Sequence, residues 1–172
     1  MHLQRIKQKT TPTFGFTLVE MLIVITIIGL LAGLLFPAIG SAIRSAKRAK
    51  ARTEVMNLAA AFRAYYTEFG YWPTNLSETL PVTTNTFANS KGILFYDFSL
   101  RDVDMETTYY RDPWQRPYWF RVDHDYNNSI PSPFQGDGNI AAGVIVWSEG
   151  PDGANYTMKR SALANRYVIT SW

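Results

Sequence analysis

The stretch from Gly15 to Ile39, GFTLVEMLIVITIIGLLAGLLFPAI, decides the fold of this 172-residue chain. Between Phe16 and Ile39 the only charged side chain is that of Glu20. As an α-helix, the segment from Leu18 to Ile39 would rise by about 33 Å, which is enough to cross a hydrocarbon core of about 30 Å. This length and the near-absence of charge predict a membrane-spanning helix rather than a buried helix of a soluble core.

The segment before this stretch is short and basic. Residues 1–15 hold Arg5, Lys7 and Lys9 and no acidic residue, so they account for the whole formal net charge of +3. The rest of the chain carries 14 basic and 14 acidic residues, which argues against a dedicated nucleic-acid-binding domain. A secretory signal peptide also begins with basic residues, but its small-residue cleavage site follows the apolar run. Here the small residue Gly15 precedes the run.

The junction from Gly15 to Glu20 (GFTLVE) resembles the class III leader junction of type IV pilins and type II secretion pseudopilins. Pro37 also stands where these families carry a proline. The resemblance implies that a prepilin peptidase removes residues 1–15 by cutting after Gly15 on the cytoplasmic side, and that Phe16 is then N-methylated. The chain would be the substrate of this chemistry and not an enzyme.

Glu20 is the residue that the apolar run makes conspicuous. A carboxylate in hydrocarbon is costly, which favours a functional role. The resemblance implies that Glu20 meets the N-terminal amine of a neighbouring subunit and fixes the register of assembly; the alternative is a side chain that reaches the headgroups. The Gly29-x-x-x-Gly33 spacing allows close helix approach in membranes. Pro37 removes one backbone hydrogen bond and predicts a kink or a loosened turn.

The basic residues after the span point to a conflict in topology. Five of them lie between positions 44 and 52, and a positive-inside count would place this side in the cytoplasm. Processing needs a cytoplasmic leader, so we expect a single-pass inner-membrane protein with a periplasmic C-terminal domain. Arg44, Arg48 and Arg52 share one helical face. That face favours acidic neighbours or lipid headgroups over DNA, because no aromatic residue accompanies it on the same stripe.

The pattern predicts an α+β fold, with one long N-terminal helix packed on a small antiparallel β-sheet. We expect the helix to run from Thr17 to Phe69, with a transmembrane half at 16–41 and an amphipathic half at 42–69. The periplasmic pilin-like domain would cover 42–172. Within it, a variable connection at 70–112 would precede a β-sheet region at 113–172. The expected strands are 117–122, 143–148 and 167–171, and 91–98 is either a strand or a packed turn.

Two later motifs narrow the resemblance. Asp112–Tyr118 (DPWQRPY) and Ser148–Gly153 (SEGPDG) resemble segments of major pseudopilins. They imply a structural subunit of a type II secretion pseudopilus, which polymerises through its N-terminal helix in the periplasm to drive protein export. The implied partners are further copies, minor pseudopilins, the prepilin peptidase, an inner-membrane assembly platform and membrane lipid, with no nucleic acid. The alternatives are a type IV pilus subunit for adhesion or motility and a subunit of a DNA-uptake filament.

Metal binding and catalysis have weak support in the sequence. The chain has no cysteine. The resemblance implies calcium in the loop of the second motif, where Asp152 and the carbonyl of Glu149 match two ligand positions, but no acidic residue follows Asp152. The segment from Asp123 to Asn127 offers the first oxygens of an EF-type loop and is more typical of a polar turn. His124, the one histidine outside the leader, favours a solvated loop over a catalytic site.

Overall fold

A computed structural model describes residues 15–74, 78–154, 156–162, 165 and 167–172. The expected α+β class is confirmed, because one long helix packs on a small antiparallel sheet. The elements are, in order, α1 (Leu18–Phe69), β1 (Leu80–Pro81), η1 (Leu100–Asp102), β2 (Tyr118–Val122), β3 (Ile130–Pro131), β4 (Asn139–Ile140), β5 (Val144–Ser148) and β6 (Ile169–Thr170). The residues form two compact units, one ending at Ala42 and a globular unit from Ile43 to Trp172.

Helix α1 has the bounds that its sequence predicts to within one residue. It begins at Leu18, and it ends at Phe69 because Gly70 takes a φ of +75° and donates its N–H to the Tyr66 carbonyl at 2.8 Å. Pro37 lies inside α1, and the helix is continuous through it. The turn around Pro37 is therefore helical in the single chain.

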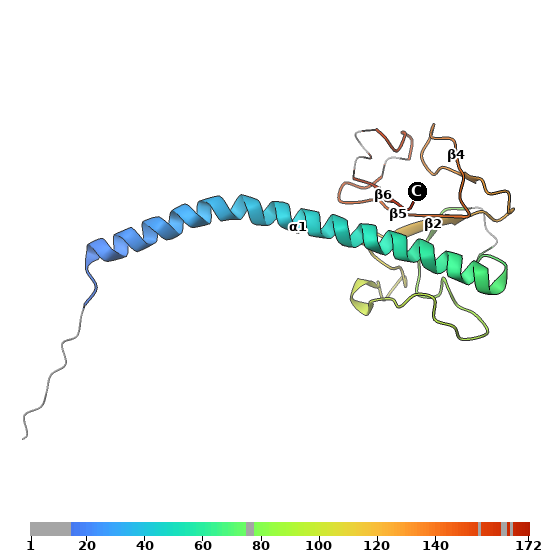
Figure 1. Cartoon of the computed structure of the whole chain (residues 1–172), viewed down its shortest axis with the longest axis horizontal. Coiled ribbons are helices and arrows are strands. Elements are labelled where there is room, and N and C mark those ends of the chain that lie inside the picture. The colour runs from blue at the N-terminus through green and yellow to red at the C-terminus, as the bar shows by residue number, and fades with distance from the viewer. Residues whose placement is uncertain (1–14, 75–77, 155, 163–164, 166) are drawn as a thin grey trace, which may run out of the picture. The chain divides into compact units, whose positions relative to one another are not determined.

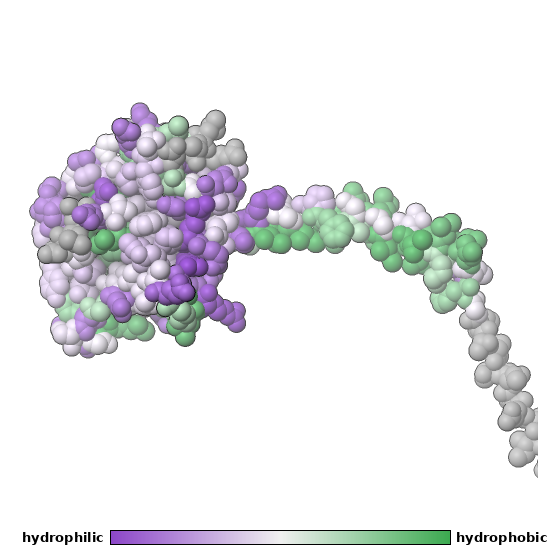
Figure 2. Space-filling view, turned by 180° about the vertical axis from the view of Figure 1, so that it is seen from behind, coloured by the Kyte–Doolittle hydropathy of each residue, from purple (hydrophilic) through white to green (hydrophobic). Residues whose placement is uncertain are grey.

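The segment Leu18–Ile39, here called the apolar segment, is exposed along its length. Its large hydrophobic side chains are exposed, among them Leu18 at 83% and Phe36 at 72%. The most apolar 18-residue window of α1 has a mean hydropathy of 2.7 and no buried residue. Figure 2 shows this helical surface as a run of hydrophobic side chains. By length and composition the segment can cross a membrane.

The globular unit is built on a four-stranded antiparallel sheet with the order β1-β2-β5-β6. The central pair is β2 and β5, joined in a register that sets Phe120 opposite Val146. Figure 1 shows these two strands beside the C-terminal half of α1. Pro81 in β1 lies on an edge strand, where a missing N–H costs no ladder bond.

Both faces of the sheet are covered, which explains why all five residues of β5 are buried. Val144 and Val146 point into the larger core with Leu58 and Phe62 of α1. Ile145 and Trp147 point into a second core with Ile130, Phe134 and the flanking Trp119. Since successive side chains of a strand alternate between faces, two cores require an uninterrupted apolar run such as VIVW.

The sheet differs from the sequence expectation in its small elements. The three expected strands are present, as β2, β5 and the short β6, but β1 and the separate β3–β4 pair were not predicted. Each of these is two residues long and contains too few side chains to show a period of two. Residues 91–98 form turns and irregular structure, so the packed-turn alternative holds.

Candidate functional site

The N-terminal end of α1 is closed by a reciprocal capping box between Thr17 and Glu20. The Thr17 N–H and hydroxyl both donate to Glu20 Oε2, at 2.8 and 2.7 Å, and the Glu20 N–H donates to Thr17 Oγ1 at 3.2 Å. This T-x-x-E pattern satisfies amide groups that have no partner within the helix. In the single chain, the Glu20 carboxylate, which is predicted to act in assembly, is therefore already hydrogen-bonded to Thr17.

The residues predicted for processing and for helix contacts lie on open surface. Phe16, next to the expected cut, is 77% exposed. A Cβ built on Gly15, Gly29 or Gly33 would meet no atom within 4 Å apart from the adjacent chain. Pro37 is exposed as well. The described chain therefore leaves these residues exposed.

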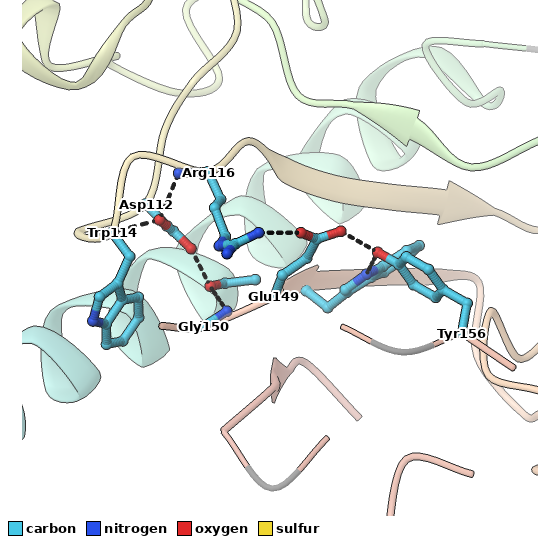
Figure 3. A network of polar contacts seen from close by, with 8 residues as sticks. Asp112, Trp114, Arg116, Glu149, Gly150 and Tyr156 are labelled. Atoms are coloured by element: carbon cyan, nitrogen blue, oxygen red, sulfur yellow. Dashed lines mark hydrogen bonds and ion pairs between the residues drawn. The ribbon is translucent and has the colours of Figure 1, made fainter. Parts of the chain in front are cut away.

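The two motifs of the globular unit meet beside the ends of β2 and β5 (Figure 3). Asp112 Oδ1 accepts the N–H groups of Trp114 and Arg116, both at 2.9 Å. Its Oδ2 accepts the Ser148 hydroxyl at 2.5 Å, and Ser148 Oγ accepts the Gly150 N–H at 3.1 Å. One carboxylate thus closes the turn that leads into β2 and ties it to the end of β5.

Asp112 is completely buried, with 0% of its surface exposed. Burial raises the pKa of its carboxyl above the ordinary value of 3.8, because the charged form loses hydration. The hydrogen bonds from Ser148 and from the amides of Arg116 and Trp114 act in the opposite direction and favour the charged form. Asp112 therefore joins the two motifs through hydrogen bonds, while its burial disfavours ionisation of its carboxyl.

A second polar chain runs from Arg116 across β5 (Figure 3). Arg116 Nη1 lies 3.4 Å from Glu149 Oε2, and the Tyr156 hydroxyl donates to Glu149 Oε1 at 2.7 Å. Trp147 Nε1 donates in turn to the Tyr156 oxygen at 3.1 Å. Burial raises the pKa of Tyr156, so it keeps its proton and remains a donor. Both oxygens of Glu149 are therefore occupied within the fold.

Residues 13–36 match the family model described as the prokaryotic N-terminal methylation motif. The matched segment is type IV prepilin-like. The match covers the leader junction and most of the apolar segment, and it confirms the resemblance stated for GFTLVE. No curated protein and no solved structure matches the chain significantly.

The predicted calcium site has an incomplete set of ligands. Calcium takes six to eight oxygens, usually with more than one carboxylate. The Glu149 carboxylate is used by Arg116 and Tyr156, which leaves the exposed Asp152 to supply charge. In the part of the chain that the structure describes, no group of three or more His, Asp or Glu side chains is placed to hold a metal. These residues alone do not fit calcium, and the site stays a prediction.

The segment from Asp123 to Asn127 forms a turn closed by its own first residue. Asp123 is buried, and its two carboxylate oxygens accept the N–H groups of Asn127 at 3.1 Å and Asn128 at 2.7 Å. Asp125 Oδ2 accepts the Asn127 side-chain amide at 2.6 Å. His124 is exposed beside them. The geometry is that of a polar turn, as its incomplete EF-type pattern indicates.

A buried carboxylate on α1 was missed by the sequence reading. Glu54 is 9% exposed, and it accepts the hydroxyls of Tyr110, at 2.9 Å, and Tyr118. Lys50 Nζ lies 3.8 Å from the same carboxylate and 2.8 Å from Asp102 Oδ2. The signal was available, because Glu54 falls on the face of α1 that also carries Val55 and Leu58, where an acid needs partners.

Proposed function

We propose that the chain is a class III prepilin whose processed form polymerises through its N-terminal helix as a structural subunit of a type II secretion pseudopilus. The observation that carries the proposal is the methylation motif at residues 13–36, followed by a helical segment with no buried residue. In this proposal the apolar segment holds the subunit in the inner membrane and then forms the filament core. The globular unit faces the periplasm.

In this proposal, Glu20 has a resting state and an assembled state. At rest, Thr17 occupies its carboxylate. After the cut, the new N-terminal amine lies on Phe16, directly before Thr17. On assembly, Glu20 exchanges its Thr17 bonds for the amine of a neighbouring copy. Opposite charges attract more strongly in a medium of low dielectric than in water, so this pair would fix the axial register of helices that otherwise slide.

The choice of a pseudopilus over a pilus rests on the globular unit. The motifs DPWQRPY and SEGPDG resemble those of major pseudopilins, and they pack on one another through Asp112 and Ser148. A type IV pilus subunit shares the N-terminal motif but is not the family that these two segments resemble. The resemblance of these two segments is the support for a secretion role.

Intact mass and N-terminal sequencing of the protein from native membranes test the processing step. We expect a chain that begins at N-methylated Phe16, which would also place the leader in the cytoplasm and the globular unit in the periplasm. A chain that still begins at Met1 would contradict the proposal. The basic residues after the apolar segment would then argue for a cytoplasmic globular unit.

The variant Glu20→Ala tests the assembly step. We expect normal cleavage after Gly15 and loss of filaments, because the carboxylate is not part of the globular fold. Glu106→Ala, which removes an exposed carboxylate far along the chain, serves as a matched control with normal filaments. Filament formation by Glu20→Ala at the level of the control would exclude the proposed register role.

A deletion strain separates the pseudopilus from its two rivals. Loss of exoprotein secretion supports the proposal. Loss of extracellular filaments with secretion intact would indicate a type IV pilus subunit. Loss of DNA uptake alone would indicate a subunit of a transformation filament.

A further inference from the structure

A pocket of about 540 Å³ opens in the globular unit between α1 and the C-terminal segment of the chain. Arg48 and Arg52 line it from α1, and Arg160, Tyr167 and Trp172 line it from the other side. All of these residues lie within Ile43–Trp172. We refer to this site as the basic pocket. The basic stripe has no aromatic residue of its own on α1. In the folded chain, Tyr167 and Trp172, which are distant in sequence, lie beside it.

The basic pocket carries an excess of positive side-chain charge. Among the residues that the structure describes, its lining includes the side chains of three arginines and none of an aspartate or glutamate. The salt bridges found among the described residues use other cations, namely Lys50, Lys91, Arg111 and Arg116. Three guanidinium groups around one cavity, with no acidic side chain among its described lining residues, form a site that favours an anion.

Two of the three guanidinium groups are held in place by aromatic rings. The Arg48 guanidinium carbon lies 4.3 Å from the centre of the Tyr167 ring, and that of Arg160 lies 5.9 Å from the centre of the Trp172 ring. Arg160 Nη1 also donates to Thr170 Oγ1 at 3.3 Å. Such contacts fix the planes of the guanidinium forks, and a positioned fork can donate two parallel hydrogen bonds to one phosphate group.

We propose that the basic pocket binds the phosphate of an anionic phospholipid headgroup. Arg48 lies nine residues after Ile39, the end of the apolar segment, so a helix places it within about 14 Å of the end of the span. Arginine together with tyrosine and tryptophan is the composition found at membrane interfaces. The inference rests on the membrane anchoring in the proposed function, and it is independent of the choice between pilus and pseudopilus.

A nucleic-acid ligand fits the same pocket less well. Binding of single strands relies on aromatic ring faces that stack on bases. In the basic pocket, the rings of Tyr167 and Trp172 are each engaged by a guanidinium. Phosphate recognition remains, without a platform for bases. The geometry therefore favours a ligand that is read through its phosphate alone.

The test uses the full chain in a neutral detergent and measures dissociation constants for four probes. These are short-chain phosphatidylglycerol, short-chain phosphatidylcholine, inorganic phosphate and a single-stranded oligonucleotide. We expect phosphatidylglycerol to bind most tightly. Equal binding of phosphatidylcholine, equal binding of inorganic phosphate, or tighter binding of the oligonucleotide would each overturn the assignment to an anionic lipid.

Variants locate the binding within the molecule. We expect Arg48→Gln and Arg160→Gln each to weaken phosphatidylglycerol binding about tenfold. Arg44→Gln removes the same charge from the same stripe of α1 but lies outside the pocket, and we expect less than a twofold change. Equal losses in all three variants would show a diffuse basic surface and overturn the pocket.

Arg52→Gln is the variant that tests lipid binding with the least risk to the fold. Arg52 is exposed and makes neither of the two ring contacts, so this variant keeps the aromatic packing while it removes one donor. Unchanged lipid affinity in Arg52→Gln, Arg48→Gln and Arg160→Gln would exclude the proposal. The measurement needs neither processing nor polymerisation, so its failure is distinct from the failure of the proposed function.

Discussion

The two halves of α1 differ in where their apolar side chains lie. From Leu18 to Ile39 the large hydrophobic residues are exposed, whereas Val55, Leu58 and Phe62 are completely buried. The globular unit satisfies its own motifs, through Asp112 and its partners. The apolar segment carries a motif that its own fold leaves almost untouched. The difference separates side chains that the globular unit buries from side chains that stay exposed in the apolar segment.

The largest expected effect is that of Gly150→Ala in the globular unit. Gly150 has a φ of +71°, and a Cβ there would lie 2.3 Å from the Tyr167 carbonyl oxygen. We expect a loss of more than about 4 kcal/mol in the free energy of unfolding, because a backbone atom must move. Urea unfolding of the full chain in detergent, followed by tryptophan fluorescence, measures it.

Gly92→Ala is the matched control for Gly150→Ala. Gly92 has a φ of +66°, with no atom within 4 Å of a built Cβ. We expect it to cost only the backbone strain of a left-handed residue, about 1–2 kcal/mol. Equal losses in the two variants would contradict the close approach between Gly150 and Tyr167.

Substitutions of Asp112 should reduce the unfolding free energy by an intermediate amount. Asp112→Ala removes the acceptor of two amides and one hydroxyl in a buried site, so we expect a loss of about 3 kcal/mol in unfolding free energy. Asp112→Asn keeps an acceptor for the amides and should cost less. Denaturation at pH 7 compares the two variants with the wild type.

The comparison of the wild type with Asp112→Asn also predicts how stability depends on pH. The folded pKa of Asp112 is raised above its ordinary value of 3.8, so the folded state favours the protonated carboxyl. Its contribution to stability is full below pH 3.8 and is lost as the pH rises through the folded pKa. Over that window, the wild type should lose stability relative to Asp112→Asn. A constant difference between the two would contradict the raised pKa.

Thr17→Val should have a small and local effect. The change removes the hydroxyl that exchanges hydrogen bonds with Glu20, at a cost of about 1 kcal/mol to the first turn of α1. Hydrogen exchange at the Glu20 amide should become faster, and Thr17→Ser should restore protection. The unfolding free energy of the globular unit should stay constant, and a change there would break the separation between the two regions.

The smallest expected effect on stability is that of Gly29→Leu combined with Gly33→Leu. Both glycines face open space and lie outside the globular unit. We therefore expect the unfolding free energy of the globular unit to change by less than about 0.5 kcal/mol. Filament yield should nevertheless fall, because leucine side chains prevent close helix contact. Filaments at the wild-type level, measured against the neutral double change to alanine, would mean that these positions face lipid in the assembly.

The sequence predicted the parts of the fold whose patterns are long. The apolar run, the helical spacing up to Phe69 and the runs of β2 and β5 each extend over enough residues to reveal a period. The two-residue strands β1, β3 and β4 could not be predicted, because their pairing depends on neighbours that are distant in sequence.

At the candidate site, the sequence identified residue types but not their partners. Glu20 was recognised from its apolar surroundings, yet the T-x-x-E pattern that engages it with Thr17 was overlooked. The meeting of Asp112 with Ser148 and the joining of Arg48 to Tyr167 depend on tertiary contacts. No local pattern encodes such contacts, so they required the structure.

The position of β5 between two cores has a consequence for the kinetics of folding. Its residues contact α1 on one face and Ile130 and Phe134 on the other, so neither hydrophobic cluster is complete until this strand is in place. Leu58 and Phe62 belong to the same cluster as Val146, which follows them by about 85 positions, and contacts of such high sequence separation form slowly. The ribosome completes α1 long before it reaches β5. Until then, the apolar face of the C-terminal half of α1 has no strand to pack on. At this stage of synthesis the nascent chain exposes the most apolar surface to a chaperone or the membrane.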